Sequence, residues 1–306
     1  MAAIPPSGRQ YVITHGPHRA VVTEVGGGLR AYTFDGVDLI DGYGEGEMCS
    51  VARGAPLLPW PNRLQDGQYE FRGTRHQTAL TEPDRRNAIH GLTRWRNWSA
   101  REHEADRVTM TLRLHPEEGY PFMLELAIDY RLSDRGLSVE TTAANVGTQA
   151  LPYGAGQHPY LTVGTDRIDD ALLRVPALQR LEVDDRQIPT GRTIPVQGTA
   201  FDFLELRRIG PTRLDTAFAN LIVDADGLTR LEMQAPAGPS KLTLWMDASY
   251  RFVMVFTGDT IPQAARRRRG LGLEPMTCAP NAFRSGDGLI VLEPGQTMTS
   301  LWGILR

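Results

Sequence analysis

The stretch from Met123 to Leu132 reads MLELAIDYRL, and it decides the fold class of this 306-residue chain. Leu, Ile or Tyr occupies every even-numbered position from 124 to 132, whereas Glu, Asp and Arg occupy positions 125, 129 and 131. Successive side chains of a β-strand point to opposite faces of the sheet, so this alternation predicts a strand with one buried face. The segment SDRG at 133–136 then predicts a hairpin turn into a second strand over 137–142.

Other segments of the chain have the same short, alternating or apolar character. They cover residues 10–14, 20–25, 29–34, 107–114, 228–234, 241–246 and 252–256. Helical periodicity is weak, and the two best helix candidates, 201–205 and 213–218, are short. Many short strands separated by turns predict an all-β sandwich or barrel, which can reach this length as one unit. We therefore predict a single domain over residues 1–306.

The composition narrows the functional classes. Hydrophobic residues at 41% and charged residues at 23% are typical of a soluble globular protein. A net charge of −3 argues against a nucleic-acid partner, and the basic run from Arg266 to Arg269 is predicted to be a solvated loop. No apolar run approaches the ~20 residues of a membrane helix, and the segment from Met1 to Arg9 lacks the apolar stretch of a signal peptide.

The cysteines and the single lysine narrow the classes further. Cys49 and Cys278 show neither a disulfide framework nor a metal-type spacing, so both are interpreted as free thiols. The expectation is a cytoplasmic protein without a membrane partner, present as a monomer or weak homodimer. Lys241 is the only lysine and lies in an alternating strand pattern, where a solvent-facing side chain is expected. An enzyme that forms an imine through lysine is therefore not expected.

The first candidate site residues lie in two stretches. Residues 59–70 read PWPNRLQDGQYE, and residues 87–91 read NAIHG. The two prolines fix the backbone that leads to Arg63, and DG at 66–67 is a hairpin signal. One interpretation is that Arg63 and His90 converge on a polar ligand. The other is that Arg63 holds a loop in place and His90 is a buried histidine with all its hydrogen bonds made.

Three further residues have contexts that suit chemistry. His158 lies between glycines and a proline, beside aromatic residues, which suits a positioned general acid. Glu274 lies in an apolar, uncharged segment, where burial raises the pKa of a carboxyl unless polar partners surround it. Asp215 is either a site residue or a helix-capping aspartate. The remaining histidines, His15, His18, His76, His103 and His115, are predicted to lie on the surface.

Taken together, these motifs resemble those of the aldose 1-epimerases (galactose mutarotases), which interconvert the α and β anomers of free sugars. The resemblance covers most of the chain and rests on Asn62-Arg63, Gly67 with Tyr69, Asn87 with His90-Gly91, His158-Pro159-Tyr160, Asp215 with Phe218, and the Glu274 segment. It implies a large antiparallel β-sandwich of the galactose mutarotase-like supersandwich type, with few short helices and a sugar cleft on one sheet. The chain departs from the family pattern at Leu92 and after Glu274, which leaves the preferred sugar open.

The resemblance also implies a role for each site residue. Glu274 would be the general base and His158 the general acid, while Arg63 and His90 would hydrogen-bond the sugar's ring and anomeric oxygens and Asp215 its hydroxyls. Opening a pyranose needs a proton removed from the C1 hydroxyl and one delivered to the ring oxygen, so neither metal nor cofactor is expected. We expect a bell-shaped pH profile, with nearby carboxylates favouring protonated His158 and the arginine favouring ionised Glu274.

Three other functions remain open from the sequence. A non-catalytic carbohydrate-binding domain on the same fold would not need both His158 and Glu274. An epimerase for phosphorylated hexoses would need extra cations at the cleft rim, for which Arg94, Arg96 or the 266–269 run are candidates. A glycoside hydrolase would use two carboxylates such as Asp215 and Glu274 and would leave His158 without a role. Candidates for an aromatic platform under the sugar are Trp60, Trp95 and Tyr160.

Overall fold

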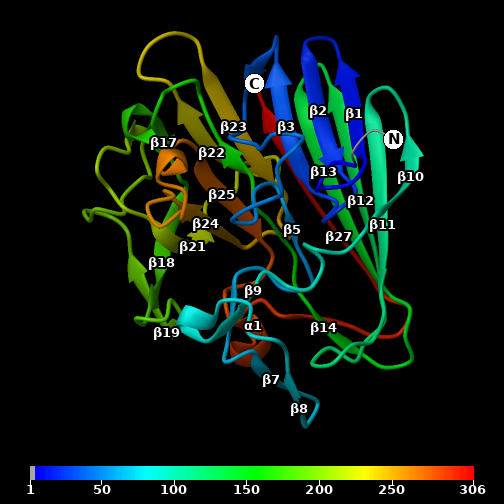
Figure 1. Cartoon of the computed structure of the whole chain (residues 1–306). Coiled ribbons are helices and arrows are strands. Elements are labelled where there is room, and N and C mark those ends of the chain that lie inside the picture. Colours follow the sequence, from blue (N-terminus) through cyan, green and yellow to red (C-terminus); the bar gives the residue numbers. More distant parts are fainter. Residues whose placement is uncertain (1–3) are drawn as a thin grey trace.

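Antiparallel β-strands make up most of residues 4–306, the part of the chain that the computed structural model describes (Figure 1). Every pairing between named strands in this part is antiparallel. The all-β prediction is confirmed. Residues 1–3, which begin the N-terminal segment and the predicted 1–306 domain, lie outside the described residues.

The larger of the two main sheets has nine strands. In spatial order they are β10 (Ser99–His103), β11 (Arg107–Leu114), β12 (Leu124–Ser133), β13 (Gly136–Asn145), β27 (Thr297–Leu305), β23 (Lys241–Met246), β22 (Thr229–Gln234), β17 (Leu172–Arg174) and β20 (Arg207–Arg208). The stretch that predicted the fold class forms β12, and its even-numbered residues from Leu124 to Leu132 are all buried. The hairpin to β13 is present, with Ser133 opposite Gly136.

The second main sheet has eight strands. Seven follow the order β19 (Pro189–Pro195), β18 (Ala177–Val183), β21 (Asp215–Leu221), β24 (Phe252–Phe256), β25 (Leu271–Met276), β15 (Gly156–Gln157) and β5 (Pro56–Leu57), and β16 (Tyr160–Leu161) also pairs with β25. Alternate residues of its central strands, such as Val253 and Val255, join one continuous core with β12, β13 and β27. Phe252 and Met254 belong to a separate apolar cluster. The eight-stranded sheet therefore buries one face in the sandwich core and turns the other outward.

A third sheet covers the β11–β12 end of the nine-stranded sheet. It contains β1 (Gln10–His15), β2 (His18–Thr23), β3 (Leu29–Phe34) and β4 (Val37–Asp38), drawn in blue in Figure 1. Ile13 and Tyr32 of this sheet join the main core, and the Tyr130 hydroxyl donates a 2.8 Å hydrogen bond to the Gly27 carbonyl. The N-terminal strands are thus packed into the same core rather than forming a separate unit.

Short elements gather at one end of the sandwich, at the bottom of Figure 1. They are the strand pairs β6 (Arg63–Gln65) with β9 (Asn87–Ile89), β7 (Gln68–Phe71) with β8 (Thr74–Gln77), and β14 (Leu151–Tyr153) with β26 (Ile290–Leu292), and the helix α1 (Ala282–Ser285). Three 3₁₀ turns complete the described elements: Pro83–Arg85, Ile168–Asp170 and Ala264–Arg266. Few short helices were expected, and few are present.

The two predicted helices are wrong. Residues 201–205 are irregular, with a turn residue at 201 and a bend at 204–205, and most of 213–218 lies in β21, which is hydrogen-bonded between β18 and β24. Sheet pairing on both sides outweighs the weak helical pattern of this segment. Asp215 begins β21, so the helix-cap interpretation of this residue is also wrong.

The DG pair at 66–67 forms a tight turn but not the predicted hairpin. Asp66 and Gly67 both have positive φ, at 56° and 61°. The strands on either side do not pair with each other, because β6 pairs with β9 and β7 pairs with β8. The turn therefore redirects the chain between two small sheets.

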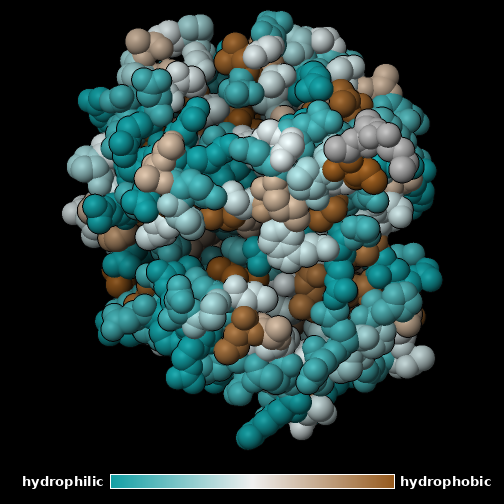
Figure 2. Space-filling view, viewed as in Figure 1, coloured by the Kyte–Doolittle hydropathy of each residue, from teal (hydrophilic) through white to brown (hydrophobic). Residues whose placement is uncertain are grey.

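The face of the molecule in Figure 2 is mostly hydrophilic, with hydrophobic residues scattered over it. No helix within residues 4–306 is long and apolar enough to cross a membrane.

Candidate active site

All five predicted site residues line one pocket, Arg63, His90, His158, Asp215 and Glu274. Its volume is about 480 Å³, within the range typical of small-molecule sites. The five residues come from segments up to 211 positions apart in the sequence, from 63 to 274. The fold therefore brings together the residues that the sequence singled out.

The outward face of the eight-stranded sheet forms the floor of this pocket. In β25, Leu271 and Leu273 point into the sandwich core, so Glu274 points to the opposite face. Glu274 lies directly across from Met254 in the middle of β24, and Asp215 of β21 lies across from Phe256 at the C-terminal end of β24. Strand alternation thus places two carboxylates on one side of a sheet whose other side is buried.

His158 lies between β15 and β16, and its backbone is held on both sides. Its N–H donates to the Ala55 carbonyl at 3.1 Å, and its carbonyl accepts from the Gly54 N–H at 2.9 Å. The imidazole stacks on Tyr160, with 4.9 Å between ring centroids and 18° between the planes. Its Nε2 lies 3.2 Å from Oε1 of Glu274. The expected acid and base are therefore in direct contact, and both are almost fully buried.

Arg63 is held between two carboxylates. Its Nε and Nη2 donate to the two oxygens of Glu82 at 3.0 and 3.1 Å, a bidentate geometry. The same Nη2 lies 3.5 Å from Oδ2 of Asp215, and Arg85 contacts both carboxylates at 3.4 and 3.8 Å. Arg63 thus faces the pocket and also holds the loop that carries Glu82, so the two interpretations of this residue are compatible.

His90 presents one defined nitrogen as a hydrogen-bond acceptor. The backbone N–H of Asn62 donates to its Nδ1 at 3.2 Å. A neutral imidazole that accepts at Nδ1 carries its proton on Nε2. Burial and the neighbouring charges lower the pKa of His90 well below its usual value, which favours this neutral form. Among residues 4–306 no partner hydrogen-bonds to Nε2 of His90, which lines the pocket.

The sequence comparisons identify the family. The family model described as aldose 1-epimerase matches residues 9–303. This chain belongs to the aldose 1-epimerase family. It is 37% identical over 291 residues to the uncharacterized protein YihR of Escherichia coli K12, which covers 95% of this chain and 91% of YihR. It is 30% identical over 165 residues to human galactose mutarotase, and the match spans 51% of this chain and 46% of that protein.

The fold of this family member also matches solved structures. The GalM/aldose epimerase homologue from C. elegans superimposes with a TM-score of 0.84 at 19% identity. The match covers 97% of this chain and 99% of that one. At this identity the comparison shows the fold, which is the galactose mutarotase-like sandwich that the resemblance implied.

In this aldose 1-epimerase family member, burial is the largest influence on the protonation of Glu274 and His158. Burial raises the pKa of Glu274 well above its usual value, and Asp215 raises it further while Arg63 opposes both effects. Burial lowers the pKa of His158 to about 3. The free protein therefore favours a protonated Glu274 beside a neutral His158. The expectation of protonated His158 is wrong for the free protein, because the sequence does not show how completely the pair is removed from water.

Two polar atoms of this pair have no partner among residues 4–306. They are Nδ1 of His158 and Oε2 of Glu274, both inaccessible to solvent. Buried polar atoms are rarely left without a hydrogen bond unless a ligand or a catalytic role accounts for them. Each side chain of the pair therefore has one polar atom that the described protein residues leave without a hydrogen bond.

We expect Glu274→Gln to be more stable than the wild type at neutral and alkaline pH. A carboxyl whose pKa is raised in the folded state contributes stability below its unfolded pKa of about 4.5 and loses it as pH rises toward the folded pKa. Glutamine has the same shape and no charge, so it does not show this loss. Thermal unfolding from pH 4 to pH 8 should give a gap between variant and wild type that widens with pH. A gap that is constant across this range would contradict the assignment.

Gly91 fixes the backbone beside His90. It has a φ of +64°, and a Cβ at this position would lie 2.0 Å from the Leu58 carbonyl oxygen. Gly36 has a similar φ of +76° but open space around it, so Gly36→Ala measures the conformational cost alone. We expect Gly36→Ala to cost about 1 kcal/mol and Gly91→Ala about 1–3 kcal/mol more, because the backbone must move. Chemical denaturation measures both, and equal losses would show that the contact with Leu58 is unimportant.

None of the three aromatic candidates is an open platform for the sugar. Trp60 is buried and packs on Phe283 with 5.4 Å between ring centroids. Trp95 is exposed but does not line the pocket. Tyr160 lines the pocket, yet its ring already stacks on His158 and lies under the Arg53 guanidinium at 4.8 Å. Tyr160 is therefore better placed to support His158 than to stack on a sugar.

The pocket also contains charged residues that were not among the five predicted site residues. Glu82 and Arg85 lie in the segment between the two motifs of Arg63 and His90, and they complete the ion-pair network around Arg63. A charged run at 82–86 between two candidate motifs was the available signal. Arg94 also lines the pocket, whereas Arg96 instead forms an ion pair with Glu117.

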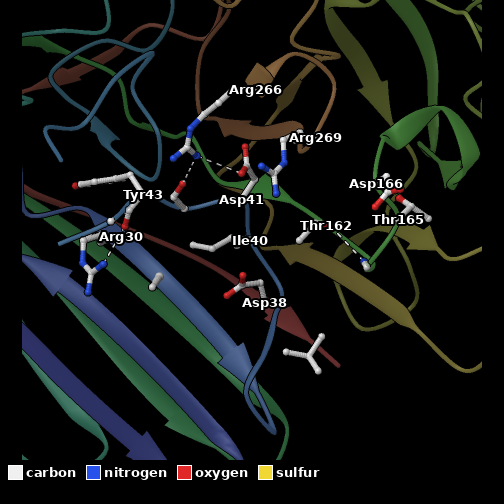
Figure 3. A pocket seen from close by; sticks show the side chains of 15 residues that line it. Arg30, Asp38, Ile40, Asp41, Tyr43, Thr162, Thr165, Asp166, Arg266 and Arg269 are labelled. Atoms are coloured by element: carbon white, nitrogen blue, oxygen red, sulfur yellow. Dashed lines mark hydrogen bonds and ion pairs between the residues drawn. The ribbon is translucent and has the colours of Figure 1, made fainter. Parts of the chain in front are cut away.

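A larger cavity of about 630 Å³ lies elsewhere, beside β3 and β4, and holds none of the five site residues (Figure 3). In Figure 3 the Arg266 side chain points to Asp41, with 3.4 Å between Nη1 and Oδ1, and it also donates to the Gly42 carbonyl at 2.7 Å. Arg266 is therefore already paired within the protein, and size alone does not make this cavity the active site.

The predictions that the 266–269 run and His18 are exposed are wrong, whereas those for the free cysteines and for Lys241 are confirmed. The 266–269 run is not simply a solvated loop, because Arg268 is buried and contacts Asp169 at 2.9 Å and Asp259 at 3.1 Å. His18 is buried with its Nδ1 2.9 Å from the Tyr32 hydroxyl. Both cysteines are free, and Lys241 is half exposed and pairs with Glu232 on β22. Within residues 4–306 no group of three or more His, Cys, Asp or Glu side chains is arranged to hold a metal ion.

Proposed function

We propose that the protein is an aldose 1-epimerase that interconverts the α and β anomers of free hexoses such as glucose or galactose. The observation that carries the proposal is the 3.2 Å contact between His158 Nε2 and Glu274 Oε1 in the pocket that Arg63, His90 and Asp215 also line. Membership of the aldose 1-epimerase family supports the reaction type. Human galactose mutarotase, which matches about half of the chain, names one hexose to test.

The proposed reaction uses the proton that Glu274 and His158 share. When that proton lies on His158, the Glu274 carboxylate accepts the proton of the C1 hydroxyl and the imidazolium delivers its proton to the ring oxygen. The bond between C1 and the ring oxygen breaks, the C1 carbonyl forms, and the pair returns to protonated Glu274 and neutral His158. Rotation about the C1–C2 bond and the reverse transfers give the other anomer, with atoms and charges balanced at each step.

Burial suits this cycle. The neutral form of the pair, which the free protein favours, is the form that remains after ring opening. The charged form differs from it by one proton moved across the 3.2 Å contact. The raised pKa of Glu274 also makes it a stronger base than an exposed carboxylate, nearer to the working pH. The reaction as proposed requires no cofactor.

Arg63 and His90 have donors that suit the sugar oxygens. The proton on Nε2 of His90 is the one donor of that ring without a partner within residues 4–306. Asp215, held by Arg63 and Arg85, is proposed to accept hydrogen bonds from sugar hydroxyls. The position of each residue in the lining of the pocket supports these assignments.

Polarimetry of freshly dissolved α-D-glucose and α-D-galactose tests the proposal. The optical rotation should reach its equilibrium value faster in proportion to protein concentration, and a His158→Ala variant should lose this acceleration. A rate equal to that of buffer for every aldose tried would overturn the proposal and favour a binding role for the fold.

The expectation of a cytoplasmic monomer or weak homodimer is part of the same proposal. The two free cysteines support a reducing compartment. Cell fractionation and analytical ultracentrifugation test the location and the oligomeric state.

A further inference from the structure

Arg94 is a cation of the pocket that has no carboxylate partner. Arg63 and Arg85, the other two arginines of the pocket, are both paired with Glu82 and Asp215. Within residues 4–306 no carboxylate oxygen comes within 4.0 Å of the Arg94 guanidinium. The one hydrogen bond that its guanidinium makes to this part of the chain runs from Nη2 to the Ile89 carbonyl at 3.2 Å. The guanidinium lies 5.7 Å from the Trp95 ring centroid.

The Arg94 side chain lies at the end of the pocket near the two histidines. Its Nη2 donates to the carbonyl of Ile89, the residue before His90, and the His90 and His158 ring centroids are 5.3 Å apart. Glu82 and Asp215 form ion pairs with Arg63 and Arg85 instead. The pocket thus has a carboxylate-rich end around Arg63 and an end around Arg94 where positive charge is not neutralised.

An arginine in this position is suited to an oxyanion. The guanidinium has five N–H donors in a planar fork, and Arg94 uses one of them within the protein. Half-buried charge without a partner is costly, so a ligand that neutralises it gains binding energy. The fork geometry matches two oxygens of a phosphate, carboxylate or sulfonate group.

The proposed mechanism indicates where this group lies on the sugar. His158 delivers its proton to the ring oxygen, and in a pyranose the ring oxygen is bonded to C5, which carries C6. The histidine end of the pocket, where Arg94 lies, is therefore the end toward which C6 is directed, while the C1 hydroxyl faces Glu274.

We propose that the preferred substrate is an aldose with an anionic group on C6, and that Arg94 binds this oxyanion. The inference rests on the proposed epimerase function and narrows its substrate class. Phosphate, carboxylate and sulfonate share the chemistry that Arg94 recognises, and the experiment distinguishes them. The exposed cations that the sequence offered for this role lie elsewhere, since Arg96 pairs with Glu117 and Arg266 lines the other cavity.

The test compares anomer interconversion of glucose with that of glucose 6-phosphate, glucuronate and 6-deoxyglucose 6-sulfonate. For each sugar, kcat/KM is measured with the wild type, Arg94→Met, Arg94→Lys and Arg96→Met, and rates without protein are subtracted. We expect at least one anionic sugar to exceed glucose in the wild type. Arg94→Met should lower the ratio of anionic to neutral kcat/KM by about 10- to 100-fold, mainly through KM, because charge-assisted hydrogen bonds are lost. Arg94→Lys should keep part of the ratio, and Arg96→Met should keep all of it.

Either of two results overturns the inference. Glucose could be the best of the four substrates, or Arg94→Met could leave the ratio unchanged. Calorimetric titration of the same sugars separates this failure from failure of the proposed function. If no sugar is interconverted, the epimerase proposal is wrong. In that case the inference holds as a binding preference only if anionic sugars bind the wild type more tightly than glucose does and Arg94→Met removes this difference. Equal binding of all four sugars would overturn both.

Discussion

Replacing Glu274 by glutamine is expected to lower kcat for anomer interconversion by about 10²–10⁴-fold, the range over which a positioned acid or base contributes. Glutamine keeps the shape of the side chain beside His158 and removes its ability to accept the C1 hydroxyl proton. KM should change much less, because Arg63, His90 and Asp215 remain in the pocket. Steady-state polarimetry or coupled-assay kinetics over pH 4 to pH 9 measures both constants. The wild-type rate should fall as pH rises through the raised pKa of Glu274, where the pair loses its shared proton, and this fall should be absent from the residual activity of the variant.

The double variant gives a sharper test of the pair. If Glu274 and His158 exchange a proton through their 3.2 Å contact, removing both should cost little more than removing one. The losses in kcat for Glu274→Gln and His158→Ala should therefore fall well short of multiplying. If kcat of the double variant instead falls by the product of the two single-variant factors, the residues act independently. That result would contradict the shared-proton mechanism.

Replacing Arg63 by methionine is expected to destabilise the protein by about 3 kcal/mol, because a buried cation between two carboxylates is lost. Arg63 is 6% exposed, and its removal leaves Glu82 and Asp215 facing each other without their main counter-charge. Both carboxylates keep some contact with solvent and with Arg85, so the loss should be at the low end for a buried ion pair. Urea denaturation measures it, and kcat/KM at a temperature where the variant is folded should fall as well.

Arg113→Met is the matched control for Arg63→Met. Arg113 also forms an ion pair, with Glu125 at 3.1 Å, but both side chains are about half exposed. A surface pair of this kind contributes about 0–1 kcal/mol, so the control should be close to wild type in stability and activity. Equal stabilities for the two variants would show that the Arg63 network does not hold the pocket together.

Local patterns were sufficient for the fold class and drew attention to His158 and Glu274, whereas the full set of five site residues depended on the family resemblance. The alternation over 123–132 depends only on the period of a strand, and the structure places it in β12 as predicted. His158 and Glu274 were singled out because a histidine between glycine and proline, and a lone carboxylate in an apolar segment, are unusual locally. Both line the pocket.

The errors share one cause, which is that they depend on contacts between distant segments. Residues 213–218 form a strand because β18 and β24 pair with them on both sides. His158 is buried in contact with Glu274, 116 positions away in the sequence, and Arg268 is buried in contact with Asp169 and Asp259. Neither burial nor an ion-pair partner at such separations can be read from local composition.

The alternatives to an epimerase fit the geometry less well. A binding domain has no use for an acid and a base in direct contact and buried at the centre of the pocket. A glycoside hydrolase that used Asp215 and Glu274 would need one of them free to protonate a leaving group or to attack, yet Asp215 is held by Arg63 and Arg85. It would also leave the contact between His158 and Glu274 unexplained.

The most direct test of the central claim is a crystal structure of Glu274→Gln with a bound aldose. The account predicts that the anomeric hydroxyl lies within about 3.2 Å of the residue 274 amide and the ring oxygen within about 3.2 Å of Nε2 of His158, the reach required for proton transfer. A sugar bound with its anomeric carbon turned away from these two residues, or bound in the cavity beside Asp41 and Arg266, would contradict it.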